Sequence, residues 1–420
     1  MTSRPVGATE CFVYVTLPGE TAAVTAGRFA QETSRQGVVT GRFVYGRSYL
    51  ARPDAVELDP VELRLGTRTY QTVLMEGLFG ALRDAGPDRW GRRLVEKQAG
   101  VTGLGELDYL LHSPDDRAGA LGFGLGPTPQ VSVRPHNRSI DLARLQEIAD
   151  RLVGDESRPS GVDAVQVEEL LLLGTSMGGA RPKAVVEDDG GLWLAKFNRA
   201  DDRWNMARVE HAMLALAHAC GLTVAESRLV AVAGRDAILV KRFDREKTEG
   251  GYTRARMVSA LTLLRADEGQ RERWSYVVLA EELRRISADA RRDAAELFRR
   301  MVFNALISNI DDHPRNHAVI APGRGWRLSP AYDLTPATPV SLDRRDLAMT
   351  AGDLGRWANA KNLVSQAPRF LLTPDGASRI VDDMEALVRA RWYETARAGG
   401  VSEADCASIA GAFAYPGFRA

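Results

Sequence analysis

The residues best suited to chemistry lie in a polar stretch between positions 309 and 333. Asp311 is followed five positions later by Asn316, and a second acid, Asp333, comes further along. Phosphoryl transfer needs such a set. One carboxylate orients and deprotonates the attacking hydroxyl, while amide and carboxylate oxygens hold Mg²⁺ on the phosphates. Protein-kinase catalytic loops space their base Asp and metal-binding Asn identically. We predict Asp311 as catalytic base and Asn316 and Asp333 as magnesium ligands; the alternative is a polar loop shaped by turn chemistry.

Two elements must position this stretch. The apolar residues 301–307 predict the end of a helix, which Pro314 prevents from running on through the polar cluster. Residues 318–320 and 326–328 flank a Pro-Gly-Arg-Gly turn and predict a β-hairpin, with Asp333 just after its second strand.

A histidine pair offers an alternative metal site. His313 and His317 are four residues apart, beside Asp311 and Asp312. The break at Pro314 argues against zinc, because it removes the helix that would place both rings on one face.

A glycine-rich segment, residues 174–183, indicates a phosphate cradle. Small residues let backbone N–H groups approach an anion, and Lys183 adds positive charge. It matches neither the Walker A loop nor the glycine loop of protein kinases, and a tight turn is the alternative. The candidate nucleotide-binding residues of this segment are Thr175, Ser176, Met177, Gly178, Gly179 and Ala180.

Lys196 lies among apolar residues of a predicted strand and precedes a predicted helix that carries Glu210. A strand lysine that binds nucleotide phosphates, with an acid on the following helix, is the small-lobe arrangement of kinases. A solvent-facing lysine on an edge strand is the alternative. The order of the parts along the chain favours a kinase.

The amino-acid composition limits which classes of function are compatible with the chain. The 420 residues include 55 basic and 55 acidic side chains, which argues against nucleic-acid binding through a strong overall charge. Three scattered cysteines are typical of a reducing compartment. Neither a signal peptide nor an apolar stretch of membrane-spanning length is evident, so we expect a cytoplasmic protein without a membrane partner.

The predicted fold is α+β and kinase-like, with two lobes: a β-rich N-terminal subdomain and an all-helical C-terminal lobe. Strands are expected over residues 11–17, 22–30 and 41–46, and alternating residues at 55–58 and 62–65 predict two more. The expected divisions are an α+β subdomain (1–125), a connector (126–140), a small-lobe-like region with the glycine-rich loop and hinge (141–244), and a helical lobe with the catalytic and metal-binding loops (245–420).

The chain resembles the HipA-like serine/threonine kinases, the toxin components of bacterial HipBA-type toxin–antitoxin modules. The resemblance covers nearly its whole length. It rests on the segments PDRWGR at 87–92, DRAGAL at 116–121, the glycine-rich loop, KRFDR at 241–245, and NIDDHPRN with AYD at 309–316 and 331–333. Arg315 stands where the family usually has Lys, and the polar segment after the hinge is weakly matched.

The resemblance implies an ATP- and Mg²⁺-dependent serine/threonine protein kinase. It supports the roles of Asp311, Asn316 and Asp333, and assigns Lys196 to the ATP phosphates. The residues it places beside the nucleotide are Lys241, Phe243, His313 and Tyr332. Ser176 stands at the family's autophosphorylation site, where phosphate ejects the loop and inactivates the enzyme; Thr175 is an alternative acceptor.

Partners follow from the same resemblance. Family members phosphorylate a translation component such as an aminoacyl-tRNA synthetase and arrest growth. A small helix-turn-helix antitoxin, HipB-like, binds the kinase and operator DNA. Two alternatives stay open: a largely non-catalytic corepressor partner of such an antitoxin, and a kinase that acts on a small molecule.

Overall fold

The computed structural model describes residues 7–129, 137–138, 142–154 and 181–420. The chain forms two compact units, each assembled from separate segments. Unit 1 contains residues 1–197, 242–258 and 320–324, and unit 2 contains residues 198–241, 259–319 and 325–420.

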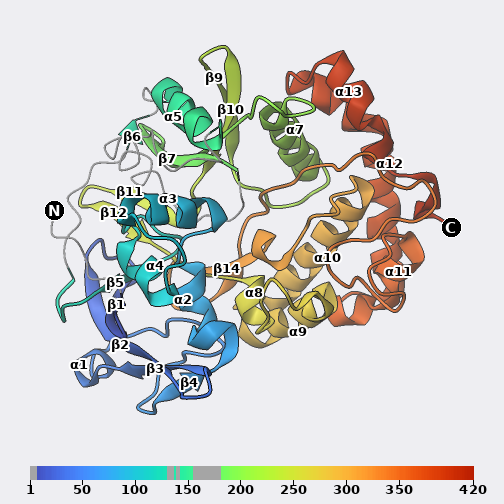
Figure 1. Ribbon diagram of the computed structural model, residues 1–420. Helices are drawn as coiled ribbons and strands as arrows, with labels where there is room; N and C mark the ends of the chain where they lie inside the picture. The colour runs from blue at the N-terminus through green and yellow to red at the C-terminus, as the bar shows by residue number, and fades with distance from the viewer. Residues whose placement is uncertain (1–6, 130–136, 139–141, 155–180) are drawn as a thin grey trace. The chain divides into compact units, whose positions relative to one another are not determined.

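Unit 1 begins with a five-stranded sheet in the order β4-β3-β2-β1-β5 (Figure 1). The expected strands are confirmed as β1 (Glu10–Thr16), β2 (Ala23–Thr33) and β3 (Val39–Tyr45). β4 (Tyr70–Thr72) and β5 (Leu121–Gly124) complete the sheet, and all adjacent pairs are antiparallel. Alternate residues of these strands are fully buried, as a half-buried sheet requires: Val13, Val15, Phe29 and Phe43.

The prediction of strands at 55–58 and 62–65 is wrong, because these residues lie in irregular backbone and bends. The buried carboxylate of Asp59 accepts backbone N–H bonds from Val61 at 2.7 Å, Glu62 at 2.6 Å and Leu63 at 3.2 Å. An aspartate that satisfies three successive backbone donors stabilises a turn in place of a strand ladder.

Short helices accompany this sheet in unit 1: α1 (Arg47–Leu50), the 3₁₀ turn η1 (Leu74–Gly77), α2 (Gly80–Asp84), α3 (Arg89–Ala99) and α4 (Glu106–His112). Asp88 caps α3 by accepting the Gly91 N–H at 2.8 Å, and Gly100 ends it in the left-handed conformation, with φ of 67°.

The second part of unit 1 holds the strand that carries Lys196. Its elements are β6 (Asn137–Arg138), α5 (Leu142–Gly154), β7 (Lys183–Asp188), β8 (Gly191–Phe197), the hairpin β11 (Arg245–Thr248) and β12 (Gly251–Arg254), and most of β13 (Arg256–Ser259). Val185, Leu192 and Leu194 form a small core against which Tyr252 of β12 packs.

Unit 2 contains the hairpin β9 (Ser227–Val232) and β10 (Arg235–Lys241), and α7 (Met206–Ala219), all as predicted. Its other helices are α8 (Ala260–Leu263), α9 (Tyr276–Ile286), α10 (Ala290–Leu306), α11 (Ala360–Ser365), α12 (Pro374–Ala398) and α13 (Glu403–Ile409). 3₁₀ turns lie at Arg271–Arg273 (η3), Pro314–Asn316 (η4), Ala367–Phe370 (η5), Ala410–Ala412 (η6) and Pro416–Phe418 (η7). The long α10 packs against α9 and α12 (Figure 1).

The fold is a mixture of helix and sheet, and an all-helical region after residue 245 is a wrong prediction. β11, β12 and β13 follow that residue, and β14 (Ala318–Ala321) and β15 (Arg327–Leu328) form the expected second hairpin. The physical reason lies at residues 249–251, where Glu-Gly-Gly favours a tight turn that closes β11 on β12. Among the described residues, no helix is both long enough and apolar enough to cross a bilayer.

Candidate active site

The predicted catalytic stretch begins where α10 ends. Met301, Val302 and Phe303 are fully buried, so tertiary packing fixes the last turns of the helix. After Leu306 the chain turns sharply: Ser308 has φ of 55°, and the Asn309 N–H donates to the Asn304 carbonyl at 2.8 Å. The helix therefore stops before the polar cluster, and Pro314 starts the separate turn η4, as the sequence predicted.

A buried carboxylate, Asp312, fixes the loop after α10. One oxygen, Oδ2, accepts hydrogen bonds from Asn304 Nδ2 at 2.7 Å and from the Tyr276 hydroxyl, and lies 2.7 Å from His317 Nε2. Asp312, Tyr276 and His317 are 2% exposed or less. Burial, together with the Asp312 charge, raises the pKa of Tyr276 well above its usual value, so the phenol stays a donor. The contacts of this one buried oxygen, Asp312 Oδ2, therefore anchor the loop to the interior of unit 2.

Asp311 has the opposite environment. It is exposed, and within the described part of the chain its carboxylate makes no hydrogen bond or ion pair. Its backbone carbonyl accepts the His313 N–H at 2.7 Å and, at a long 3.4 Å, Asn316 Nδ2. The backbone of Asp311 is thus fixed by its neighbours, while its carboxylate is exposed.

Asn316 and Asp333 belong to the same unit. Asn316 is buried, and because its Nδ2 faces the Asp311 carbonyl, its Oδ1 is turned to another direction. The Tyr332 hydroxyl donates to the Arg315 carbonyl at 2.8 Å, which ties the segment ahead of Asp333 to the loop. Asp333 itself has φ of 58°, a left-handed conformation that a residue other than glycine adopts at some cost.

The side chains of Asn316 and Asp333 are of the kind that can bind magnesium. The described residues contain no group of three or more His, Cys, Asp or Glu side chains able to hold a metal ion, so His313 and His317 form no such site there. Mg²⁺ in nucleotide enzymes needs only one or two protein oxygens, with water and phosphate supplying the rest. The oxygens of Asn316 and Asp333 are of this type.

Lys196 and Lys183 oppose each other across the antiparallel β7–β8 pair in unit 1. Lys183 is buried, and its Nζ lies 2.5 Å from Oδ2 of Asp88, the cap of α3. Lys183, which we expected to add positive charge to the glycine-rich segment, is thus paired with an acid, and most of that segment lies outside the described residues. Lys196 is half-buried on the same hairpin.

Of the two predicted hinge residues, Lys241 is held through both its backbone and its side chain. The Lys241 N–H donates to the Glu226 carbonyl at 2.8 Å, and Lys241 Nζ lies 3.0 Å from the Glu226 carboxylate. Phe243 is half-buried between two fully buried charges, Arg242 and Asp244.

Arg242 belongs to an ion network inside unit 1. Its guanidinium binds Asp116 and, at 2.9 and 3.1 Å, Asp244, while Arg245 lies 2.7 Å from Asp244. Asp244 also accepts the Gly119 N–H at 2.9 Å. Burial alone would raise the pKa of Asp244, but the two guanidiniums hold it well below its usual value. The network joins two sequence segments used above, 116–121 and 241–245.

The remaining predicted residues, Thr175, Ser176, Met177, Gly178, Gly179 and Ala180, lie outside the described residues. Sequence reasoning did not assign Asp312, His317, Tyr276 and Asn304 to one cluster. One signal was available, because Asn304 interrupts an otherwise apolar helix end and a buried amide requires a partner.

Fold and site together define a mixed helix–sheet protein with an Asp–Asn loop and a following Asp on one unit. The family model described as the HipA-like C-terminal domain matches residues 175–392, more than half of the chain. The chain belongs to the HipA-like family, which confirms the resemblance seen in its sequence.

Two curated relatives come from Sinorhizobium fredii (strain NBRC 101917 / NGR234). The first, "Putative kinase Y4mE", is 28% identical over 58% of this chain and 60% of its own length. The second, "Putative kinase Y4dM", is 32% identical over 36% of this chain and 39% of its own length. The matched regions thus span less than two thirds of either relative.

A solved structure shares the fold. It is described as the Shewanella oneidensis MR-1 toxin–antitoxin system HipA, HipB and operator DNA complex. The matching chain aligns with a TM-score of 0.67 and 15% identity, covering 94% of each chain. At this identity the match establishes similarity of fold.

Proposed function

We propose that the protein is an ATP- and Mg²⁺-dependent kinase that phosphorylates serine or threonine hydroxyls of a protein. The observation that carries the proposal is the contrast between two adjacent acids: Asp312 is buried and fixed by three partners, and Asp311 is exposed, with a carboxylate that bonds to none of the described residues. A rigid loop that presents one available carboxylate is what a catalytic base requires.

Each residue of the set then has one task. Asp311 orients the substrate hydroxyl and accepts its proton. Asn316 and Asp333 hold the metal, whose charge offsets that of the phosphates during transfer. Lys196 on β8 contacts the phosphates. The names of the relatives support kinase chemistry, and family membership supports the same assignment.

The experiment uses the intact mass of the full chain after incubation with Mg-ATP. Wild type is compared with Asp311→Asn and with Asp383→Asn, a matched control on an exposed position of α12. We expect a gain of one phosphate in wild type and control and none in Asp311→Asn. Peptide mapping then tests Ser176, with Thr175 as the alternative acceptor.

Two results would contradict the kinase proposal. One is equal phosphorylation of all three proteins. The other is no phosphate in any of them, combined with no rise in melting temperature on adding Mg-ATP. Nucleotide binding without self-phosphorylation would leave the proposed kinase activity in place and remove the proposed regulation at Ser176.

We further propose that the protein acts as a growth-arresting toxin, with a small helix-turn-helix antitoxin as partner and operator DNA bound through it. The fold shared with a HipA chain from a complex with HipB and DNA supports this. The same observation favours the second candidate, a corepressor without important catalysis. Growth arrest on expression that disappears in Asp311→Asn supports the toxin, and DNA binding with the antitoxin that persists in an inactive enzyme without any arrest supports the corepressor.

A further inference from the structure

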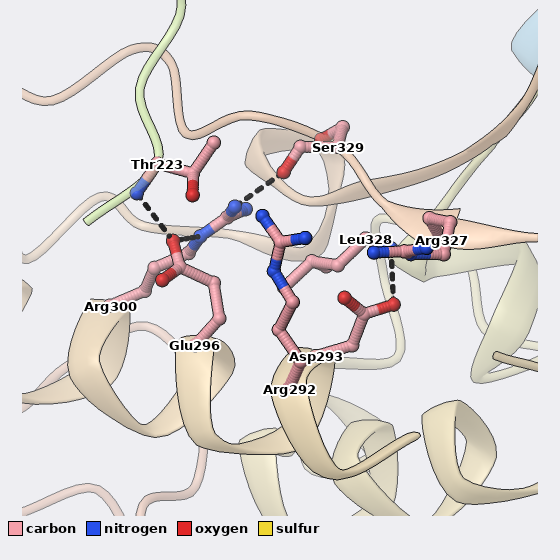
Figure 2. A pocket seen from close by; sticks show the side chains of 8 residues that line it. All are labelled: Thr223, Arg292, Asp293, Glu296, Arg300, Arg327, Leu328 and Ser329. Carbon is pink, nitrogen blue, oxygen red and sulfur yellow. Dashed lines mark hydrogen bonds and ion pairs between the residues drawn. The ribbon is translucent and has the colours of Figure 1, made fainter. Parts of the chain in front are cut away.

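A cavity of about 220 Å³ lies in unit 2, and none of its lining residues belongs to the loop that carries Asp311. Its walls come from the first turns of α10, from β15 with Ser329, and from Thr223 (Figure 2). The chemistry of these walls is dominated by charge, with three guanidiniums, those of Arg292, Arg300 and Arg327, and two carboxylates.

Both carboxylates are already committed to the protein. Asp293 accepts the Leu328 N–H at 2.7 Å and the Ser287 hydroxyl at 2.6 Å. Glu296 accepts the Thr223 N–H at 3.0 Å and Arg300 Nε at 3.2 Å. These bonds fasten Thr223 and β15 to α10, so the acids act as structural supports of the cavity.

Arg300 is less completely satisfied. Its side chain is 1% exposed, Nε binds Glu296, and Nη2 donates to the Ser329 carbonyl. Nη1 is buried and has no hydrogen-bond partner within the described part of the chain. A buried charged donor without an acceptor is costly, and an acceptor placed in the cavity would remove that cost.

Arg292 adds a second available guanidinium. It is exposed, and its side chain makes no hydrogen bond or ion pair among the described residues. In Figure 2 its guanidinium points into the cavity, toward the side where Arg300 lies. Arg327 is only loosely paired, with 3.9 Å to Asp289. Three positive and two negative side chains leave the cavity with a net charge of +1.

We propose that this cavity binds a phosphate group, either as the free anion or as a small phosphate monoester. Arginine forks match the oxygens of a phosphate, and Arg300 Nη1 and Arg292 are the donors left for it. A cavity of about 220 Å³ has room for a phosphate with a short carbon chain.

The test is thermal unfolding of the full chain at constant ionic strength, with inorganic phosphate, O-phosphoserine or chloride added. The variant Arg292→Gln is compared with Arg291→Gln, its exposed neighbour on α10, which does not line the cavity. We expect phosphate to raise the melting temperature of wild type and Arg291→Gln along a saturable curve. In Arg292→Gln the apparent dissociation constant rises about tenfold or more, because one of two charge-assisted donors is lost.

The variant pair separates this cavity from the proposed nucleotide site. Both variants keep Lys196, Asn316 and Asp333, so phosphate bound there would stabilise both proteins equally. Tighter binding of phosphoserine than of phosphate would identify a phosphorylated side chain as the source, and the reverse would identify the free anion. Equal curves for the two variants, or no saturable effect beyond that of chloride, overturns the proposal.

Discussion

Two clusters around buried carboxylates, one in each unit, are built differently. In unit 1, Arg242, Arg245, Asp116 and Asp244 compensate one another, and the partners come from segments more than 120 residues apart in sequence. In unit 2, Asp312 has no cationic Arg or Lys partner among the described residues; its contacts are a phenol, an amide and a histidine.

The difference has a clear physical meaning. Mutually compensating ions stabilise an assembly of distant segments, and breaking one leaves an unpaired buried charge. A carboxylate with a few directed donors contributes less energy but fixes direction, which is what a loop next to a reacting carboxylate needs. Breaking the ion network of unit 1 should therefore mainly lower the stability of the fold. Removing the Asp312 carboxylate in unit 2 should mainly disturb the position of the loop that carries Asp311.

The largest expected effect concerns Asp311. The change Asp311→Asn should lower the rate of phosphoryl transfer by about 10³-fold, in the range expected for loss of a general base. The free energy of unfolding should stay within about 0.5 kcal/mol of wild type, because the carboxylate is exposed and uncommitted. Rates from intact mass and urea denaturation measure the two quantities. A large loss of stability would show that Asp311 has a structural role.

Cutting the network in unit 1 should reduce stability strongly. Asp244→Asn removes the shared partner of two buried guanidiniums and should lower the free energy of unfolding by about 3–5 kcal/mol. The matched control is Asp189→Asn, in an exposed turn of the same unit, which should change it little. Equal urea midpoints for the two variants would contradict the assigned role of the network.

Acidic pH should remove the contribution of the Asp244 carboxylate to the free energy of unfolding. The pKa of Asp244 is lowered in the folded protein, so the carboxylate stabilises the fold above its ordinary pKa of about 4, and the effect disappears as pH falls through the lower folded value. The difference in unfolding free energy between wild type and Asp244→Asn should be constant from about pH 6 to pH 8 and shrink steadily below about pH 4. If the difference in unfolding free energy between the two proteins does not change with pH, the loss of stability comes from altered packing and not from the lost charge.

Asp312→Asn tests the second region. The amide carries no negative charge, so the three groups around Oδ2 lose a charged acceptor, and the free energy of unfolding should fall by about 2–3 kcal/mol. Phosphoryl transfer should also fall, since the loop of Asp311 loses its anchor. The neighbouring change Asp311→Asn is the control, because it should lower the rate of phosphoryl transfer with little change in the free energy of unfolding. Full activity in Asp312→Asn would separate the anchor from the proposed catalytic loop.

The smallest effect is expected for Tyr276→Phe. The phenol donates one of three hydrogen bonds to Asp312, and its loss should cost about 1.5 kcal/mol. Tyr393→Phe, on an exposed part of α12, is the control. Chemical denaturation compares the two, and identical values would mean that the remaining donors of Asp312 suffice.

The sequence predicted the elements around the candidate site well. The end of α10, the hairpin of β14 and β15, and the helix α7 follow from local signals such as Pro314 and apolar periodicity. The contacts that fix these elements could not be predicted from local signals, because Tyr276, Asn304 and Asp312 meet only through tertiary packing. The residues at 55–65 were misassigned because alternation is also compatible with a turn capped by Asp59.

Unit 1 also has a consequence for synthesis of the chain. Its final segment is residues 320–324, where the carbonyls of Gly323 and Arg324 accept hydrogen bonds from Arg256. At about 5–20 residues per second, a ribosome needs on the order of tens of seconds to reach that segment. The N-terminal sheet can form early, but the partner of Asp116, Arg242, is made much later, and unit 1 stays incomplete until about half of unit 2 has been made. During this interval the incomplete unit leaves apolar surface exposed to solvent, which is the kind of surface that makes a nascent chain prone to aggregation.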